Sequence, residues 1–377
     1  MVYYLTYNER PNGLYQSQVL ETLDFVNDHL SIDCTLIAFV SWRTYFSDRY
    51  TIKKLLPKSR VFPSIPKFIW IAMNGLQLLP ILVANKPVKL IGRGPLATFI
   101  VLFLKRHFFP NVTVCLDSRG LAAVEDKEYG VYPPRVAAVL PLLEQRALAL
   151  SDCVSVITDR MKEHLMNAYD ISDSTKFVTI PCTISDHFVT QHGGDTITRE
   201  KLGIDADSTL LAYVGSTAKW QSFGLLINWL DIVLGRHVNS SVLLLCERTA
   251  DISELIAKYP GRVVNIKVPF RSVYHHLKLA DYGLLLREAS ATNWVSSPTK
   301  TAEYLISGLP IITNRNIQVA ELIADENVGI VLNDFECPET LQPVSQNLRQ
   351  RCIKVADNFS KNNPVIKKRL AWLYAPK

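Results

Sequence analysis

The stretch ADYGLLLREASATNWVSSPTKTAEYLISGLPIIT, residues 280–313, decides the fold expected for this chain. Its pattern predicts a buried strand over Tyr282–Leu286, a loop over Glu288–Thr299, a helix over Lys300–Ser307 and a second buried strand over Leu309–Thr313. These elements make one βαβ unit of a parallel sheet. In open α/β folds, the loop after the first strand lies at the carboxyl edge of the sheet, where ligands bind.

The start of this helix is typical of an anion site, because its first N–H groups lack partners within the helix and carry partial positive charge. Pro298 suits the helix start since it has no N–H to lose, and Ser297 and Thr299 offer capping hydroxyls. Lys300 adds a cation. Glu303 lies on the same face and can accept two hydrogen bonds from a ribose. The alternative interpretation is an ordinary crossover with solvated Lys300 and Glu303.

SPTKTAEYLISGLPII, residues 297–312, resembles the nucleotide-sugar-binding segment of family 4 retaining glycosyltransferases of the GT-B fold, particularly those that build bacterial surface polysaccharides. The resemblance implies that Glu303 holds the ribose of the donor and that the turn before it holds the diphosphate. The family usually carries a second glutamate eight residues earlier, facing the donor sugar. Val295 occupies that position here.

The resemblance also implies an α/β architecture of two Rossmann-like, doubly wound parallel-sheet domains that face each other across a cleft. Residues 1–185 would form the acceptor-side domain and residues 186–364 the nucleotide-sugar-binding domain. The C-terminal helix, residues 365–377, would pack back on the first domain. With 377 residues, of which 48% are apolar and 20% charged, the chain is long enough for two such domains.

The second half starts again with a predicted strand over Thr209–Val214, followed by Gly215 and Lys219 before the next helix. In the family, this element faces the diphosphate and the leaving group with an arginine and then a lysine. The resemblance places Lys219 at the lysine and Ser216 where the arginine is expected. A solvated Lys219 is the alternative.

Three arginines are open as the source of the missing charge, namely Arg248, Arg271 and Arg287. The resemblance further implies that the loop around Phe270 contacts the base of the nucleotide.

On the acceptor side, a predicted strand over Val112–Leu116 runs into Asp117-Ser118-Arg119-Gly120, which matches one form of the family's acceptor motif. Asp117 would act as a base or bind the acceptor hydroxyl, and Arg119 would meet phosphate or hold Asp117 in place. Together with Lys219, these are the expected catalytic residues. The alternative is a structural ion pair, either Asp117–Arg119 or Arg119–Glu125.

The first loop of the chain is the other acceptor-side candidate. NGLYQSQV, residues 12–19, resembles the family's glycine-containing loop after the first strand and contributes Asn12, Gly13 and Gln16. A plain turn between strand and helix is the alternative.

Composition limits the partners. A net charge of +6 and a pI near 8.8, without a basic run interleaved with aromatics, argue against a nucleic-acid binder and suit anionic ligands or an anionic membrane face.

The seven cysteines include no CxxC pair and are expected to be free thiols in a reducing compartment. Without a signal peptide or a spanning segment, the expected location is cytoplasmic, with peripheral contact at the inner face of the plasma membrane. Pro66–Trp70 is a candidate for touching lipid, and an internal helix is the alternative.

The sequence therefore predicts a retaining, metal-independent hexosyltransferase without a cofactor. It would move a sugar from a nucleotide-diphosphate sugar to a glycan or lipid-linked acceptor of capsule, exopolysaccharide or lipopolysaccharide. Two alternatives remain: a GT-B-like nucleotide-sugar-binding subunit with weak or no turnover, and a GT-B-type nucleotide-sugar epimerase.

Overall fold

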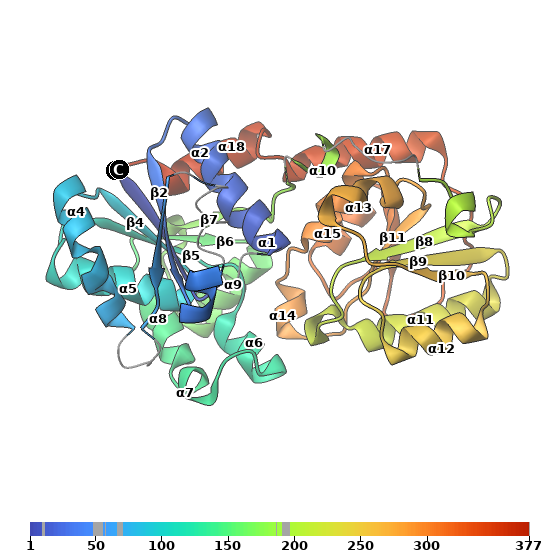
Figure 1. The fold of residues 1–377 in the computed structure, drawn as a ribbon, viewed down its shortest axis with the longest axis horizontal. Helices are drawn as coiled ribbons and strands as arrows, with labels where there is room; N and C mark the ends of the chain where they lie inside the picture. Colours follow the sequence, from blue (N-terminus) through green and yellow to red (C-terminus); the bar gives the residue numbers. More distant parts are fainter. Residues whose placement is uncertain are drawn as a thin grey trace. The chain divides into compact units, whose positions relative to one another are not determined.

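The computed structural model describes residues 1–9, 12–47, 56, 58–65, 71–185, 187–190 and 197–376. The candidate lipid-contacting segment, Pro66–Trp70, lies outside these residues. The chain divides into two compact units, one of Met1–Cys182 with Lys361–Lys377 and one of Thr183–Ser360 (Figure 1). Each unit is built on its own parallel sheet.

The first unit holds a seven-stranded sheet in the order β3-β2-β1-β4-β5-β6-β7. Its strands are β1 (Val2–Tyr7), β2 (Cys34–Val40), β3 (Ser59–Pro63), β4 (Lys89–Arg93), β5 (Thr113–Asp117), β6 (Cys153–Val156) and β7 (Phe177–Thr179). All neighbouring pairs are parallel. Side chains alternate between two apolar layers, so Tyr3 and Leu5 face one layer while Val2 and Tyr4 face the other.

Helices cover both faces of this sheet. They are α1 (Gly13–Tyr15), α2 (Glu21–His29), α4 (Leu79–Asn85), α5 (Gly94–His107), α6 (Ala122–Tyr129), α7 (Pro134–Ala137), α8 (Leu140–Leu150), α9 (Asp159–Ala168) and α18 (Pro364–Tyr374). α5 packs in the layer of Tyr3 and Leu5, and α2 and α18 pack in the layer of Val2 and Tyr4.

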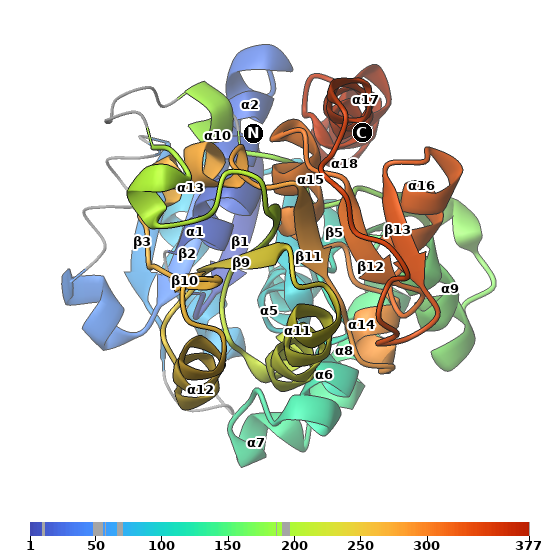
Figure 2. The ribbon, with the colours of Figure 1, turned by 90° about the vertical axis from the view of Figure 1, so that its right-hand side faces the viewer.

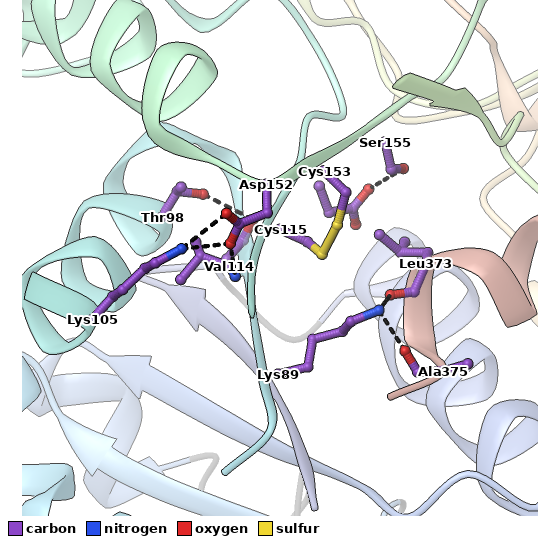
Figure 3. The surroundings of a disulfide bond; sticks show 12 residues. Lys89, Thr98, Lys105, Val114, Cys115, Asp152, Cys153, Ser155, Leu373 and Ala375 are labelled. Carbon is purple, nitrogen blue, oxygen red and sulfur yellow. Dashed lines mark hydrogen bonds and ion pairs between the residues drawn. A yellow bond between two sulfur atoms is a disulfide. The ribbon is translucent and has the colours of Figure 1, made fainter. Parts of the chain in front are cut away.

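The last helix, α18, belongs to the first unit. Ile366, Leu370 and Leu373 are buried in the same apolar cluster as strand β1. The fully buried Lys89 of β4 donates to the carbonyl oxygens of Leu373 at 3.0 Å and Ala375 at 2.5 Å (Figure 3). Because carbonyls at a helix C-terminus lack partners within the helix, this ammonium both satisfies them and complements the helix dipole.

The second unit holds a six-stranded parallel sheet in the order β10-β9-β8-β11-β12-β13. Its strands are β8 (Thr209–Val214), β9 (Ser240–Leu245), β10 (Val263–Asn265), β11 (Tyr282–Leu285), β12 (Ile311–Asn314) and β13 (Gly329–Leu332). Its helices are α10 (His187–Thr190), α11 (Phe223–Arg236), α12 (Ala250–Lys258), α13 (Phe270–Leu277), α14 (Ala291–Trp294), α15 (Thr299–Ile306), α16 (Val319–Asp325) and α17 (Gln346–Ala356). Helices α11 and α12 cover one face, and α13, α15 and α17 the other (Figures 1 and 2).

Both sheets reverse their strand order once. In the second unit the reversal falls between β8 and β11, so the loops that follow these two strands leave the sheet in opposite directions. Ligands of open α/β sheets bind in the crevice at such a switch point. The loops after β8 and β11 are therefore the place to look for a site.

The expectation of seven free thiols was wrong for two cysteines, because a disulfide joins Cys115 and Cys153 (Figure 3). These residues lie 38 positions apart in the sequence, and their pairing depends on sheet order. Strands β5 and β6 are neighbours in a register that places Cys115 opposite Cys153, with Cα atoms 4.7 Å apart. Cys34, Cys182, Cys246, Cys337 and Cys352 form no disulfide within the described residues.

No helix in the described part of the chain is long and apolar enough to cross a membrane.

Candidate functional site

Tyr304 of helix α15 joins strands β8 and β11 at the switch point. Its hydroxyl accepts a hydrogen bond from the Val214 N–H at 3.1 Å and donates to the Leu284 carbonyl at 3.2 Å, so it bridges the strands where their own pairing has ended. The ring lies against Gly283, where a Cβ would come within 2.4 Å of it. This fit fixes α15 on the sheet and so fixes the position of its first turn.

Lys300, in that first turn, is buried and points back toward the strand end of β8. Its ammonium lies 4.0 Å from the centre of the Tyr213 ring, a cation–π contact. Gly215 has a φ of +132°, and a Cβ there would come within 2.9 Å of the Lys300 side chain. Because Gly215 has no side chain, the Lys300 side chain can pack against its backbone. The alternative interpretation of a solvated Lys300 does not hold.

A second buried cation, Arg287, lies directly after β11 and meets Lys300 through Gln221. The Gln221 side-chain oxygen accepts a hydrogen bond from Lys300 at 2.8 Å and from Arg287 at 2.5 Å, and the Gln221 carbonyl accepts another from Arg287 at 2.8 Å. Burial, followed by the charge of Arg287, lowers the pKa of Lys300 well below its usual range. Of the three arginines left open by the sequence, Arg287 is the one that shares a hydrogen-bond partner with Lys300, and its predicted role toward the diphosphate stays a prediction.

The other two arginines do not take part in this cluster. Arg248 donates to the Ser253 hydroxyl at 3.0 Å, and Arg271 is exposed at the start of α13.

Glu303 stands one turn beyond Lys300 on α15. In the described part of the chain no hydrogen bond or ion pair reaches its carboxylate, although the residue is half-buried. Burial raises the pKa of this carboxyl to about 7. A half-buried carboxylate near the Lys300 ammonium and without a hydrogen-bond partner can accept hydrogen bonds from a ligand.

The loop before α15 differs from expectation in two ways. It contains a short helix, α14, capped by the Ser290 hydroxyl, which accepts from the Asn293 N–H at 3.1 Å. Pro298 is the N-cap residue of α15 and makes no side-chain cap bond, and the predicted capping by Ser297 and Thr299 stays a prediction. Val295, where the family usually has its loop glutamate, is buried.

Two other predicted donor-side residues, Lys219 and Phe270, lie in separate segments of the second unit. Lys219 lies in a 3₁₀ turn after Gly215 and is exposed. Phe270 begins α13, and its ring centre lies 5.6 Å from that of Phe188. Their predicted roles toward the diphosphate and the base stay predictions.

On the acceptor side, the Asp117 carboxylate is enclosed by partners within the first unit. Its oxygens accept hydrogen bonds from the Tyr4 hydroxyl at 2.5 Å and the Ser155 hydroxyl at 2.9 Å. Arg93 and Arg119 each approach within 3.6 Å. This geometry favours the alternative of a structural Asp117–Arg119 ion pair, and the predicted role of Asp117 as a base stays a prediction.

Arg119 also has hydrogen-bond partners outside the Asp117 cluster. It donates to the side-chain oxygen of Gln18 at 3.0 Å and to the Ile180 carbonyl at 3.5 Å. In the first loop, the Asn12 side chain caps α1 by accepting from the Tyr15 N–H at 2.9 Å, while open space surrounds the Gly13 Cα. Gln16 follows α1 and is half-buried. The structure thus places Arg119 in contact with the helical segment Gln16–Leu20, which follows α1.

Sequence reasoning did not single out Gln221 of the second unit, and it considered Glu125 of the first unit only as a possible ion-pair partner of Arg119. Gln221 follows Lys219 by two positions, and nothing in its local pattern indicates that it joins two cations. Glu125 on α6 packs so closely on Gly120 that a Cβ there would collide with its carboxylate. Burial raises the pKa of Glu125 to about 7, so a titratable carboxyl stands beside the Asp117–Gly120 segment.

The chain consists of two units, each built on a parallel sheet, and known structures share this fold. A glycosyltransferase from Rickettsia africae ESF-5 superposes with a TM-score of 0.69 at 14% identity, over 100% of this chain and 99% of that one. HepE of Anabaena, in complex with UDP, gives 0.64 at 12% identity, over 100% and 95%. UDP-GlcNAc 2-epimerase from Methanocaldococcus jannaschii gives 0.55 at 12% identity, over 100% of both chains.

The chain has the GT-B fold, and the resemblance to glycosyltransferases of this fold is confirmed. Residues 263–364 match the family model of the glucosyltransferase 3-like C-terminal domain, a span that includes Arg287, Lys300 and Glu303. No curated protein matches the chain. Assignment to family 4 stays a prediction.

Proposed function

We propose that this protein is a retaining glycosyltransferase that takes a sugar from a nucleotide-diphosphate donor. The diphosphate would be held by Lys300, Arg287 and the first N–H groups of α15. Lys219, in the loop after β8, would also face the diphosphate. Glu303 would hold the ribose. The cations stabilise the charge that develops on the departing diphosphate, so the catalysis is mainly electrostatic and uses no metal ion.

One observation carries the proposal: Lys300 and Arg287 meet on a single amide oxygen of Gln221 at the switch point of the second sheet. Bringing two buried cations together is unfavourable, and this is visible in the lowered pKa of Lys300. A diphosphate offsets that repulsion and accepts charge-assisted hydrogen bonds from both groups. UDP is the first ligand to test, because HepE of Anabaena is in complex with UDP.

The acceptor would be a glycan or lipid-linked sugar of a cell-surface polysaccharide, handled in the cytoplasm by the first unit near Arg119 and the loop of Asn12, Gly13 and Gln16. Asp117 would act there as a base or, as its closed hydrogen-bond shell favours, as the residue that fixes Arg119.

The test is to incubate purified protein with UDP-, GDP- and CMP-sugars, with and without a chelator, and to follow the products by NMR. Slow hydrolysis or transfer with retained anomeric configuration, unaffected by the chelator, supports the proposal. Interconversion of two sugar epimers would establish an epimerase, a reading favoured by the fold of the Methanocaldococcus enzyme. Ligand-induced stabilisation without any product would establish a binding subunit, as the buried Val295 in place of a glutamate would allow.

Replacing Glu303 with alanine should weaken UDP binding by about 10- to 100-fold, since two hydrogen bonds between ribose hydroxyls and a charged group are lost. The unliganded protein should melt at an unchanged temperature, because no partner within the described residues depends on this carboxylate. Isothermal titration calorimetry gives the dissociation constant. An unchanged constant would remove Glu303 from the site.

Donor binding should pass through an optimum with pH. As pH rises through about 7, the Glu303 carboxyl ionises and becomes an acceptor for both ribose hydroxyls, so binding strengthens. Burial and the charge of Arg287 lower the pKa of Lys300, and loss of its proton as pH rises weakens binding. A UDP-sugar is the right probe, since its diphosphate is a diester and does not titrate in this range. Glu303→Gln should abolish the acid limb alone; an acid limb that persists would contradict the assignment.

A further inference from the structure

A hollow of about 780 Å³ lies in the first unit between helices α5 and α8, on residues that the donor chemistry does not use. Its apolar lining comes mainly from Phe99, Leu102 and Phe103 of α5 and from Leu150 of α8. Phe99, Leu102, Phe103 and Arg106 follow the i, i+3, i+4, i+7 spacing of one helix stripe. The opposite stripe of α5 is buried on the sheet, whereas Phe99, Leu102 and Phe103 are half-buried and line the hollow, and Arg106 is exposed.

Leu150 shows how open the hollow is, since 59% of its surface is exposed. Next to it, Phe108 at the end of α5 is 42% exposed. Single exposed apolar side chains are ordinary, but a continuous apolar concavity is typical of a binding surface.

Cations surround this apolar surface. Lys105, Arg106 and His107 line it from the last turn of α5, and Arg146 lines it from α8, one turn before Leu150. Lys105 is neutralised by Asp152, whose oxygens lie at 2.6 and 2.9 Å (Figure 3). Arg106 and Arg146 are exposed, and neither makes an ion pair in the described part of the chain. Two uncompensated guanidinium groups therefore stand at the rim of an apolar hollow.

Helix stability alone does not explain this arrangement. Basic residues in the last turn of a helix complement its dipole, which would account for Lys105, Arg106 and His107. Arg146 lies before the last turn of α8 and gains nothing comparable. The dipole also gives no reason for the half-buried phenylalanines, Phe99 and Phe103, that line the hollow. An apolar chain attached to a negative headgroup satisfies both features at once.

We propose that the α5–α8 hollow is the surface by which this protein binds an anionic membrane, with a phospholipid acyl chain against Phe103 and Leu150 and its phosphate at Arg106 and Arg146. The two arginines contribute the electrostatic attraction and the hollow contributes apolar burial. This surface specifies where the peripheral contact expected from the sequence occurs. It is separate from the donor residues, so vesicle binding and sugar transfer can each fail without the other.

The test is flotation of the full-length protein, without nucleotide sugar, with vesicles of phosphatidylglycerol and phosphatidylcholine or of phosphatidylcholine alone. The wild type should float with the acidic vesicles only. Arg106→Gln/Arg146→Gln should lower the partition coefficient on the order of 30-fold, as expected for the loss of two cations at an anionic surface. Leu150→Ser should lower it about tenfold through lost apolar burial.

Matched controls separate the hollow from general surface effects. Arg43→Gln/Arg135→Gln removes two exposed arginines elsewhere on the first unit, and Leu142→Ser removes an exposed leucine of α8 that does not line the hollow. Both controls should float like the wild type. The proposal is overturned if the wild type ignores acidic vesicles, or if the control variants lose as much binding as the hollow variants.

Discussion

Lys300→Met is expected to weaken UDP binding about 100-fold and to lower the rate of sugar transfer by a similar factor or more, because one charge-assisted partner of the diphosphate is removed. Folding should tolerate the change. Methionine has nearly the length of lysine, and it removes both the cost of burying the ammonium and its repulsion by Arg287, which together lower the lysine pKa. If Lys300→Met loses UDP binding but keeps its stability, the Lys300 ammonium serves the ligand and not the fold.

Lys354→Met is the matched control, since Lys354 is an exposed lysine on α17 of the same unit. Its dissociation constant for UDP should equal that of the wild type. Calorimetric titration measures both variants, and thermal melts without ligand report their stability. If Lys300→Met binds UDP as tightly as the wild type, the ammonium does not contact the diphosphate and the proposed site is wrong.

Asp281→Ala should destabilise the second unit by about 3 to 5 kcal/mol, because it leaves two arginines without their shared counter-charge. The buried Asp281 carboxylate pairs with Arg199 at 2.8 Å and Arg349 at 2.9 Å and also accepts from the Leu210 N–H at 2.9 Å. These contacts tie the segment before β8 and helix α17 to the start of β11. The three segments would all lose their common anchor.

Differential scanning calorimetry can measure this effect, with UDP added to identify the transition of the second unit by its upward shift. For a unit of this size, the expected loss lowers the transition temperature on the order of 10 °C. Asp325→Ala, at an exposed position on α16, should leave the temperature unchanged. Equal melting of both variants would show that the buried network contributes little.

Regular features of the fold were predictable because they rest on local pattern. Strands β1 and β8 begin and end where apolar alternation and runs place them, and the βαβ unit of residues 280–313 is present. The edge strand β3, Ser59–Pro63, was missed since it is short, carries Arg60 and ends in a proline. Helix α14 was missed because its four residues lie in a stretch of small and polar side chains.

The chemistry of the donor site was only partly predictable. Lys300 and Glu303 share one helix turn, so their spacing shows in the sequence. Gln221 and Arg287 are 66 positions apart and meet only because β8 and β11 are neighbours in the sheet. The disulfide between Cys115 and Cys153 has the same origin. A sequence pattern reports what lies along one element, whereas these contacts depend on the order in which strands assemble.

The position of α18 has a consequence for how the protein is made. Its residues complete the first unit, yet they leave the ribosome only after the whole of Thr183–Ser360 has been synthesised. Until then, the surface that receives Ile366, Leu370 and Leu373 stays uncovered, and Lys89 lacks the carbonyls that accept its hydrogen bonds. The first unit can therefore complete its apolar core only after the second unit has been synthesised.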